Sequence, residues 1–432
     1  MKDKVAIFWF RRDLRLEDNT GLHHALKEGV PVLPLFIFDT DILDKLENRN
    51  DRRVDYIHQA INHLHKQLNE WNSGLVTFIG KPFQIFQRLM ETYEIVSVYA
   101  NRDYEPDAIS RDTAIFKLLE QNNIPFRAFK DQVIFDRNQI IKTDGTPYTV
   151  FTPYARKWKE SLSENHFAPY SFINTHLYKF PASALPSLTE IGFSKTDIQF
   201  TEPTLDPDII NDYEKFRDYP ALQRTTQLGI ALRFGTISIR NCVDFALKHN
   251  LTWLSELIWR EFFMQVLYHF PTVTTQSFKK RYDRIEWRNN EAEFAAWCQG
   301  LTGYPLVDAG MRQLNETGFM HNRVRMVTAS FLCKHLLIDW RWGEAYFASR
   351  LNDYDLAANN GNWQWAAGCG CDAAPYFRIF NPFAQNAKFD KENHYIKKWI
   401  PELNSEHYPK PIIEHQLARE RALINYRWAL DK

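Results

Sequence analysis

Short apolar runs of strand length alternate with helical segments through the first 130 residues, and this alternation restricts the fold more than any other feature. Between the second and third runs, six apolar residues recur at intervals of three and four, which is typical of an amphipathic helix. Such alternation predicts an α/β domain with a doubly wound, mostly parallel, Rossmann-like sheet. The five runs are Lys4–Phe10, Val32–Phe38, Leu75–Ile79, Ile95–Tyr99 and Phe126–Phe129, and the helical residues are Val54, Ile57, Ile61, Leu64, Leu68 and Trp71.

The pattern changes after residue 130. Residues 131–204 gather turn-forming residues, as in the sequence TDGTP that begins at Thr143, and apolar periodicity is weak there. From about residue 205 the pattern is helical, most clearly over residues 251–268, 311–337 and 343–351. We therefore predict an α/β domain over residues 1–130, an interdomain linker over 131–204 and an all-α domain over 205–432.

Composition narrows the possible classes of function. Lys and Arg together number 53, as do Asp and Glu, so net charge gives no sign of nucleic-acid binding, although phosphate contacts need only a local basic face. No apolar stretch of about 20 residues and no signal peptide is present, so we expect a cytoplasmic protein without a membrane segment. The chain lacks G-x-G-x-x-G after its first strand and G-x-x-x-x-G-K-[ST] throughout, which disfavours the usual dinucleotide and P-loop sites. Cys369 and Cys371 have no partner pair at zinc spacing, so we expect no metal site.

Three polar and aromatic clusters in the helical region are hard to explain as packing alone. Residues 352–365 combine two acids, several Asn and two Trp; residues 253–263 place Glu256, Trp259 and Arg260 at helical spacing; residues 321–326 hold two Arg beside Asn and His. Each has a simpler interpretation: a polar loop with Asp353 or Asp355 as helix cap, a helix with an ion pair, or a charged helix face. Trp363 and Trp365 are two positions apart, so on a helix they point in nearly opposite directions.

In this order the three clusters resemble the flavin domain of photolyases and cryptochromes, through the motifs WxxExxWREF, HNRxRM and DxDLAANNGxWQW. The segments WFRRDLRLEDN from Trp9, FTPY from Phe151 and RIFNP from Arg378 resemble the same family, so the similarity covers essentially the whole chain. It is closest to the bacterial class I cyclobutane pyrimidine dimer photolyases. The resemblance implies an antenna-type domain over residues 1–130 and an FAD-binding catalytic domain over 205–432. It also implies a deoxyribodipyrimidine photo-lyase, which uses blue light to repair DNA by electron transfer from photoexcited reduced FAD.

The resemblance implies a buried FAD in the helical domain. Asp353 and Asp355 match residues that meet the ribose and the flavin ring, and Arg325 matches the partner of the first acid. Asn359 matches the residue that faces flavin N5, where an amide cannot supply a proton and so favours the reduced, anionic flavin. The matching FAD-binding positions are Tyr213, Thr225, Thr226, Gln227, Leu228, Gly229, Trp253, Arg325, Asp353, Tyr354, Asp355 and Asn359.

Two further sets follow from the same resemblance. Trp287, Trp340 and Trp363 match the three-tryptophan chain that reduces the flavin. The second set contacts DNA and a pyrimidine dimer flipped from the stack. Within it, Glu256 forms a hydrogen bond to the dimer as the radical anion of the dimer forms. Its members are Arg217, Glu256, Trp259, Arg260, Asn322, Arg323, Met326 and Trp365.

The antenna site departs from the folate-binding members of the family. Arg53, Asp103 and Glu105 look more like the deazaflavin-binding type, and FMN or no second chromophore stays an alternative. We expect DNA containing pyrimidine dimers as the partner, no membrane, and a monomer. The main rival function is a cryptochrome-type blue-light photoreceptor, against which Asn359 and the dimer set argue. A nucleotide hydrolase on the α/β domain would need a phosphate loop or a metal cluster.

Overall fold

The computed structural model describes residues 2–180 and 184–431 and begins with a five-stranded, all-parallel sheet. Its strands lie in the order β3-β2-β1-β4-β5. Strands β2 and β3 are added on one side of β1, and the chain then crosses over to add β4 and β5 on the other side. The predicted doubly wound α/β arrangement is thus confirmed, and the strand boundaries agree with the apolar runs to within two residues. The strands are β1 (Lys4–Phe10), β2 (Val32–Asp39), β3 (Val76–Gly80), β4 (Glu94–Asn101) and β5 (Phe126–Phe129).

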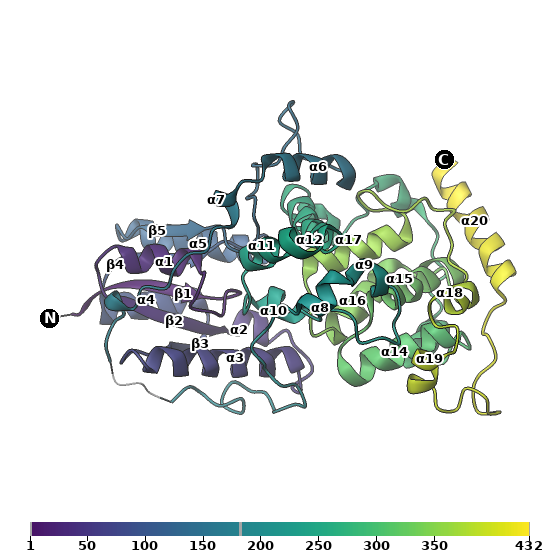
Figure 1. Cartoon of the computed structure of the whole chain (residues 1–432), viewed down its shortest axis with the longest axis horizontal. Helices are drawn as coiled ribbons and strands as arrows, with labels where there is room; N and C mark the ends of the chain where they lie inside the picture. Colours follow the sequence, from purple (N-terminus) through teal and green to yellow (C-terminus); the bar gives the residue numbers. More distant parts are fainter. Residues whose placement is uncertain (1, 181–183, 432) are drawn as a thin grey trace. The chain divides into compact units, whose positions relative to one another are not determined.

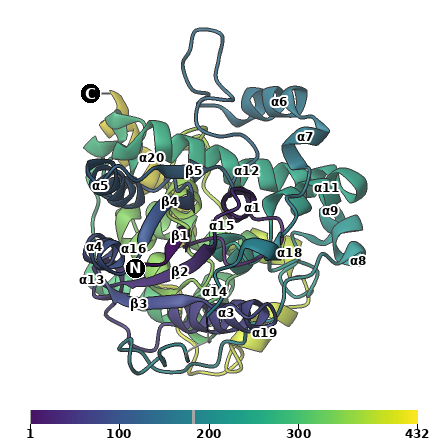
Figure 2. The same cartoon turned by 90° about the vertical axis from the view of Figure 1, so that its left-hand side faces the viewer.

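Helices cover both faces of this sheet because the buried strands are apolar on both sides (Figure 2). From β1, Ala6, Phe8 and Phe10 pack with α1 (Thr20–Lys27) and α3 (Arg52–Asn69). The apolar stripe of α3 is the one predicted from its spacing except at Trp71, which lies beyond the end of the helix and is 41% exposed. The alternate β1 residues pack with α4 (Pro82–Thr92) and α5 (Pro106–Gln121) on the opposite face. The short α2 (Thr40–Leu43) follows β2.

The α/β unit is discontinuous in sequence and differs from the predicted domain. It ends its first segment at Gln139 and also takes in Ser161–Leu205 and Gln227–Lys248. Part of the predicted linker therefore belongs to this compact unit, including α7 (Glu164–Phe167) and η1 (Asn174–His176). The later segment adds α10 (Gly229–Phe234) and most of α11 (Ile239–His249).

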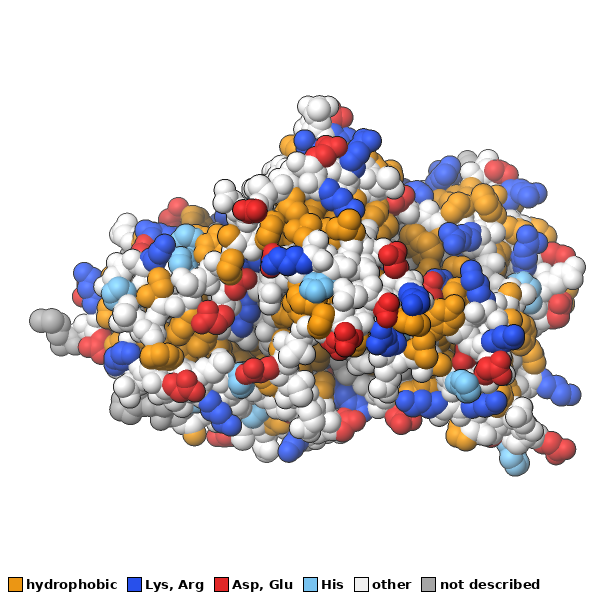
Figure 3. Space-filling view, in the orientation of Figure 1, with side chains coloured by type: hydrophobic (Ala, Val, Ile, Leu, Met, Phe, Trp, Pro, Cys, Tyr) orange, Lys and Arg blue, Asp and Glu red, His pale blue; other side chains and the backbone are white. Residues whose placement is uncertain are grey.

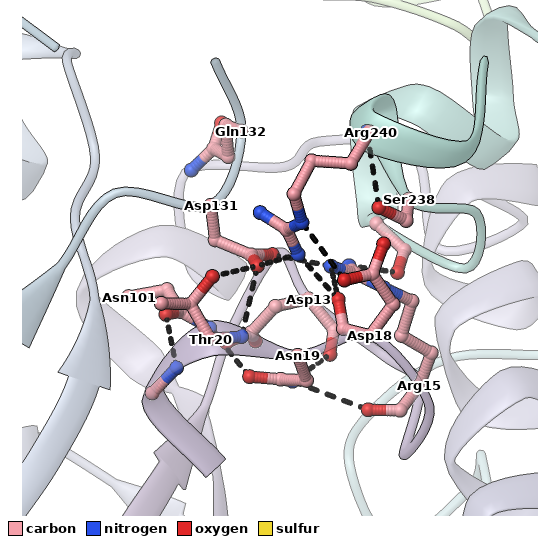
Figure 4. Close-up of polar contacts among 12 residues, drawn as sticks. Asp13, Arg15, Asp18, Asn19, Thr20, Asn101, Asp131, Gln132, Ser238 and Arg240 are labelled. Carbon is pink, nitrogen blue, oxygen red and sulfur yellow. Dashed lines mark hydrogen bonds and ion pairs between the residues drawn. The ribbon is translucent and has the colours of Figure 1, made fainter. Parts of the chain in front are cut away.

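A buried ion network explains why residues after 227 belong to the α/β unit (Figure 4). The guanidinium of Arg240 on α11 lies 2.8 Å from Asp18 and 2.8 Å from Asp131, and Arg15 lies 2.7 Å from the other oxygen of Asp131. Burial alone would raise the pKa of Asp131, but the two guanidinium groups outweigh it and hold that pKa well below its usual value. These contacts join residues more than 100 positions apart, which local sequence patterns do not reveal.

The second unit is helical and comprises Ile140–Glu160, Asp206–Thr226 and His249 onward (Figure 1). The region predicted as helical over residues 311–337 is interrupted: Gly318 adopts φ +69°, and its N–H donates to the carbonyl of Leu314 and ends the first helix. Within the described residues no helix is both long and apolar enough to span a membrane. Its elements are α6 (Phe151–Ser161), α8 (Pro207–Asn211), α9 (Tyr213–Phe216), α12 (Leu251–His269), η2 (Pro271–Thr274), η3 (Lys280–Arg284), α13 (Glu291–Gln299), α14 (Pro305–Thr317), α15 (Asn322–Ser330), η4 (Phe331–His335), α16 (Trp340–Arg350), α17 (Leu356–Ala367), α18 (Pro382–Phe389), α19 (His394–Trp399) and α20 (His415–Asp431).

Candidate active site

One partly exposed face of α12 carries three predicted substrate residues. The helix starts after Asn250, whose side-chain oxygen accepts from the N–H of Thr252 (2.9 Å) and of Trp253 (3.0 Å). Trp253 is buried, whereas Glu256, Trp259 and Arg260 are half-buried. Their spacing of three and four places the last three on one side of α12, as predicted.

The indole of Trp259 is stacked against another ring. Phe151, the first residue of α6, lies parallel to it, with centroids 3.6 Å apart and an angle of 7° between the planes. Phe262 and Phe263 of α12 flank the same indole at 5.6 and 5.5 Å. One face of Trp259 is therefore covered by the protein itself, and the half-buried side chain retains exposed surface elsewhere.

Glu256 is held by a neighbouring cation. Nη1 of Arg217 lies 2.7 Å from Oε1 of Glu256, and the same guanidinium sits 5.0 Å from the ring centre of Tyr213. Burial and then the charge of Glu256 raise the pKa of the Tyr213 hydroxyl, which stays protonated. The structure thus brings Arg217, Glu256 and Tyr213 together, although the resemblance assigns the first two to DNA and the dimer and Tyr213 to FAD.

The predicted DNA-contacting residues of the HNR motif lie on the first turn of α15. Burial lowers the pKa of His321 to about 4, so its imidazole is neutral, and Nδ1 accepts from the N–H of Arg323 as the helix cap. The guanidinium of Arg323 pairs with Asp218 at 2.7 Å. The amide of Asn322 lies 3.9 Å from the sulfur of Met326 one turn later.

Asp353 and Asp355 stand immediately before α17. Nη2 of Arg325 lies 2.9 Å from Oδ2 of Asp353, while Asp355 caps α17 by accepting from the N–H of Ala358 at 3.2 Å. Tyr354 packs against the helical core. The two acids therefore differ in role: Asp353 is paired with a guanidinium, and Asp355 caps the start of α17.

Asn359, one turn into α17, is oriented by a residue that the sequence did not single out. Its side-chain N–H₂ donates to the carboxylate of Glu344 at 2.8 Å and to the backbone carbonyl of Glu344 at 3.1 Å. Both donors of the amide are thus directed to α16, and its carbonyl oxygen is turned away from Glu344. Burial raises the pKa of Glu344.

The two tryptophans near the end of α17 have different surroundings, as their spacing predicts. Trp363 is buried against Gly343 of α16, with the rings of Phe347 at 4.9 Å and Trp297 at 6.1 Å. Trp365 is half-buried, and the guanidinium of Arg378 lies 5.9 Å from its ring centre.

The other two predicted chain tryptophans lie in the same unit. Trp340 is buried at the start of α16, three residues before Gly343, and none of the described residues accepts from its indole N–H. Trp287 is half-buried and meets Tyr426 edge to face at 6.0 Å. Gly343 links two members of the set in space, because it follows Trp340 by one turn and contacts Trp363.

Known proteins are similar to this chain over nearly their full length. Residues 253–407 match the FAD binding domain of DNA photolyase, and residues 6–171 match the DNA photolyase family. Deoxyribodipyrimidine photo-lyase of a Synechococcus strain is 36% identical over 97% of this chain and 96% of its own length. The Vibrio cholerae protein of the same name is 37% identical over 98% of this chain and 100% of its own.

The chain belongs to the DNA photolyase family. A bacterial class III photolyase structure from Agrobacterium tumefaciens is similar at 34% identity and a TM-score of 0.90, over 100% of this chain and 98% of that one. An archaeal photolyase from Sulfolobus tokodaii, described with two FAD molecules, is similar at 35% identity and a TM-score of 0.86, over 98% and 99% of the two chains. Membership of class I stays a prediction.

The residues around α17 fit an FAD-binding photolyase. A carboxylate already neutralised by Arg325, a helix-capping acid and an amide oxygen turned away from Glu344 form a set of hydrogen-bond acceptors, which suits ribose hydroxyls and the N–H groups of a flavin edge. A reduced flavin carries an N–H group at N5, and a carboxamide oxygen such as that of Asn359 can accept a hydrogen bond from it. The chain has the FAD-binding domain, and these residues would hold the ribose and flavin parts of the cofactor.

The predicted FAD-binding segment from Thr225 to Gly229 is divided in sequence between the two units. Thr225 and Thr226 end a segment of the helical unit, whereas Gln227, Leu228 and Gly229 begin the next segment of the α/β unit. Gln227 has φ +50° and Gly229 is the first residue of α10. Their role toward FAD stays a prediction.

The predicted antenna residues of this photolyase take part in ion pairs. Glu105 lies 2.9 Å from Arg12 and 2.7 Å from Arg233, and Asp103 lies 3.2 Å from Arg12. Burial alone would raise the pKa of Asp103, but the guanidinium groups of Arg12 and Arg233 lower it below its usual range. Arg53 pairs with Asp51 at the start of α3. Which chromophore these groups meet stays a prediction.

Two residues of the site escaped sequence reasoning. Phe151 belongs to the FTPY motif, but nothing in the sequence indicates that its ring covers Trp259. Glu344 lies in α16, four residues after Trp340, and belongs to none of the sequence motifs. Only the packing of α16 against α17 reveals its bond to Asn359.

Proposed function

We propose that this chain is a DNA-repair photolyase that splits cyclobutane pyrimidine dimers under blue light. The observation that carries the proposal is the joint placement, in one helical unit, of the Trp259–Glu256 face of α12 and the Asn359–Glu344 pair of α17 and α16. Reduced FAD, when bound and excited, supplies the electron that opens the dimer. The side chains bind and orient the dimer and the cofactor, and they exclude water from the site.

The roles of the substrate residues follow from their contacts. Trp259 offers a ring already supported on one face, which suits stacking of a flipped base. Glu256 lies one turn earlier and is fixed by Arg217, so its carboxylate is held in place for hydrogen bonding to the dimer. We assign Arg260, Asn322, Met326 and Trp365 to the same substrate surface, which the half-buried state of Trp365 supports.

DNA binding needs a local positive field, because the chain has no net charge. Lys and Arg side chains gather over the helical unit on the face drawn in Figure 3. Arg217 and Arg323 are each paired with a carboxylate, at 2.7 Å in both cases, so contact with phosphate would require them to share or leave that partner. We therefore expect each to contribute less to the salt dependence of binding than an unpaired arginine would.

We further propose that Trp287, Trp340 and Trp363 deliver electrons to the oxidised cofactor. The packing of Trp363 on Gly343, one turn beyond Trp340, supports this order of the last two members. We also propose that the protein works as a monomer in the cytoplasm. Light scattering after size-exclusion chromatography tests the first point, and cell fractionation tests the second.

The test of the function is illumination of the chemically reduced protein with an oligonucleotide that holds one cyclobutane thymine dimer. We expect light-dependent loss of the dimer, with multiple turnovers, and no loss in the dark. Trp259→Ala should weaken binding of this oligonucleotide by about 10- to 100-fold, since stacking on an aromatic ring is worth roughly 1–3 kcal/mol. If the fully reduced wild type removes no dimer and Trp259→Ala leaves discrimination unchanged, the chain is not a repair enzyme and a photoreceptor role takes its place.

A further inference from the structure

The helix α6 is fastened to α12 directly beside the substrate face. Phe151, Tyr154 and Trp158 lie on one side of α6, at positions three and four apart, and all are nearly fully buried. The hydroxyl of Tyr154 donates to Glu261 of α12 at 3.2 Å. The indole N–H of Trp158 donates to the same carboxylate oxygen at 2.7 Å.

The start of α6 is fixed by a second set of contacts. The backbone N–H of Phe151 donates to the carboxylate of Asp372 at 3.0 Å, and the thiol of Cys371 donates to the carbonyl of Thr149 at 3.0 Å. Asp372 holds a left-handed backbone conformation, with φ +48°. Phe151, only 9% exposed, is therefore held by backbone bonds as well as by its ring, and it cannot swing aside as a lid would.

The parallel contact between Phe151 and Trp259 acts on the orientation of the indole. A ring stacked at 3.6 Å and 7° leaves its partner little freedom to tilt. Because Glu261 lies two residues after Trp259, the bonds from Tyr154 and Trp158 keep α6 in register with this part of α12. The stacked pair and the Glu261 bonds thus form one rigid support.

We propose that Phe151 is a positioning residue for substrate recognition, which fixes the plane of the Trp259 indole so that its opposite face receives the flipped pyrimidine dimer. This inference rests on the proposed function and names a determinant of its specificity. Phe151 does not touch the substrate. Its ring contributes to the difference between damaged and intact DNA only through Trp259.

The test is a double-mutant cycle read out as the ratio of dissociation constants for intact and dimer-containing oligonucleotides. Phe151→Leu keeps an apolar side chain but removes the flat ring, and should lower this ratio about three- to tenfold while binding to intact DNA stays unchanged. In a Trp259→Ala background the same substitution should have no further effect. Phe151→Tyr, which keeps the ring, should leave the ratio within about twofold of that of the wild type.

The matched control is Phe294→Leu, because Phe294 of α13 is also stacked on a tryptophan, Trp297, at 5.8 Å and 17°. It should change thermal stability without changing the ratio, and FAD content is measured on every variant. If Trp259→Ala lowers the ratio but Phe151→Leu does not, or if Phe151→Leu lowers it equally in both backgrounds, the positioning role is refuted and the repair function stands. If Trp259→Ala itself leaves the ratio unchanged, the positioning role is refuted as well, and the proposed function fails only if the reduced wild type also removes no dimer.

Discussion

Gly343 of α16 is the position at which one added methyl group should do most damage to the predicted electron path. A Cβ atom built there would lie 2.1 Å from Cη2 and 2.4 Å from Cζ3 of Trp363, and 2.5 Å from a methyl carbon of Leu332. All three carbons belong to buried side chains, so the contact cannot be relieved at the surface. Gly343→Ala must therefore displace the Trp363 ring or separate α16 from α17.

The expected size follows from two opposing effects. Overpacking of a buried site costs about 1–3 kcal/mol. Replacing Gly by Ala inside a helix gains about 1 kcal/mol, so we expect a net loss of about 0–2 kcal/mol in the stability of the helical unit. Ala345→Gly, at an exposed position of the same helix, measures the helix-propensity difference alone and should destabilise the unit by about 1 kcal/mol.

The assay pairs stability with light-driven reduction of the oxidised cofactor. Release of FAD on heating reports the stability of the FAD-binding unit, and the initial rate of flavin bleaching under blue light with an external reductant reports electron delivery. We expect Gly343→Ala to slow photoreduction severalfold, whereas Ala345→Gly should leave it unchanged. Wild-type photoreduction together with wild-type stability in Gly343→Ala would refute the tight packing and the role assigned to Trp363.

Two further outcomes are expected in the helical unit. Trp340→Phe should abolish most photoreduction while chemically reduced protein still repairs dimers, because Phe keeps an aromatic ring but is much harder to oxidise. Trp399→Phe serves as a control. Flavin bleaching at the wild-type rate in Trp340→Phe would contradict the role of Trp340 in electron delivery. Glu344→Leu removes the carboxylate acceptor of the Asn359 amide, at a cost of about 1–3 kcal/mol for a buried donor left unbonded. Glu344→Leu should make reduced FAD reoxidise faster in air, whereas Glu344→Gln, which retains an acceptor, should change the reoxidation rate little. Equal reoxidation rates in both variants would show that Glu344 does not orient Asn359.

The α/β sheet could be predicted from the sequence because its information is local. Each strand is a run of consecutive apolar residues, and the helix at residues 52–69 shows its buried stripe in its spacing. The break at Gly318 also had a local signal, a glycine after Thr317, which the longer apolar periodicity of residues 311–337 obscured.

The extent of each compact unit could not be predicted, because it depends on pairs that are distant in sequence. Arg240, for example, binds Asp18 and Asp131 in the α/β unit across 222 and 109 positions. The same limit applies to the site: motifs identified Trp259 and Asn359, whereas their supports, Phe151 and Glu344, are visible only once helices pack together.

Arg240→Met should destabilise the α/β unit much more than loss of an exposed ion pair. Arg240 is 3% exposed, and its removal leaves the buried Asp18 and Asp131 with one cation fewer, at a cost of about 3–5 kcal/mol. The matched control is Arg52→Met, which breaks a 2.6 Å pair with the largely exposed Asp197 and should cost about 0–1 kcal/mol. Hydrogen exchange of β1 and β4 amides measures the opening free energy of this unit directly.

The pH dependence gives this prediction its sharpest form. The pKa of Asp131 is lower in the folded chain than its ordinary value, so its ion pairs contribute stability above that ordinary value, and the contribution is lost as the pH falls through the folded pKa. Without Arg240, the pKa of Asp131 in the folded state must rise, because burial is then opposed chiefly by Arg15. The variant therefore binds a proton at a higher pH than the wild type does, and the stability difference between them should narrow as the pH is lowered from 8 to 5. A difference that stays constant over this range, or that is no larger than for Arg52→Met, would show that the network of Figure 4 does not hold the Gln227–Lys248 segment in the unit by charge.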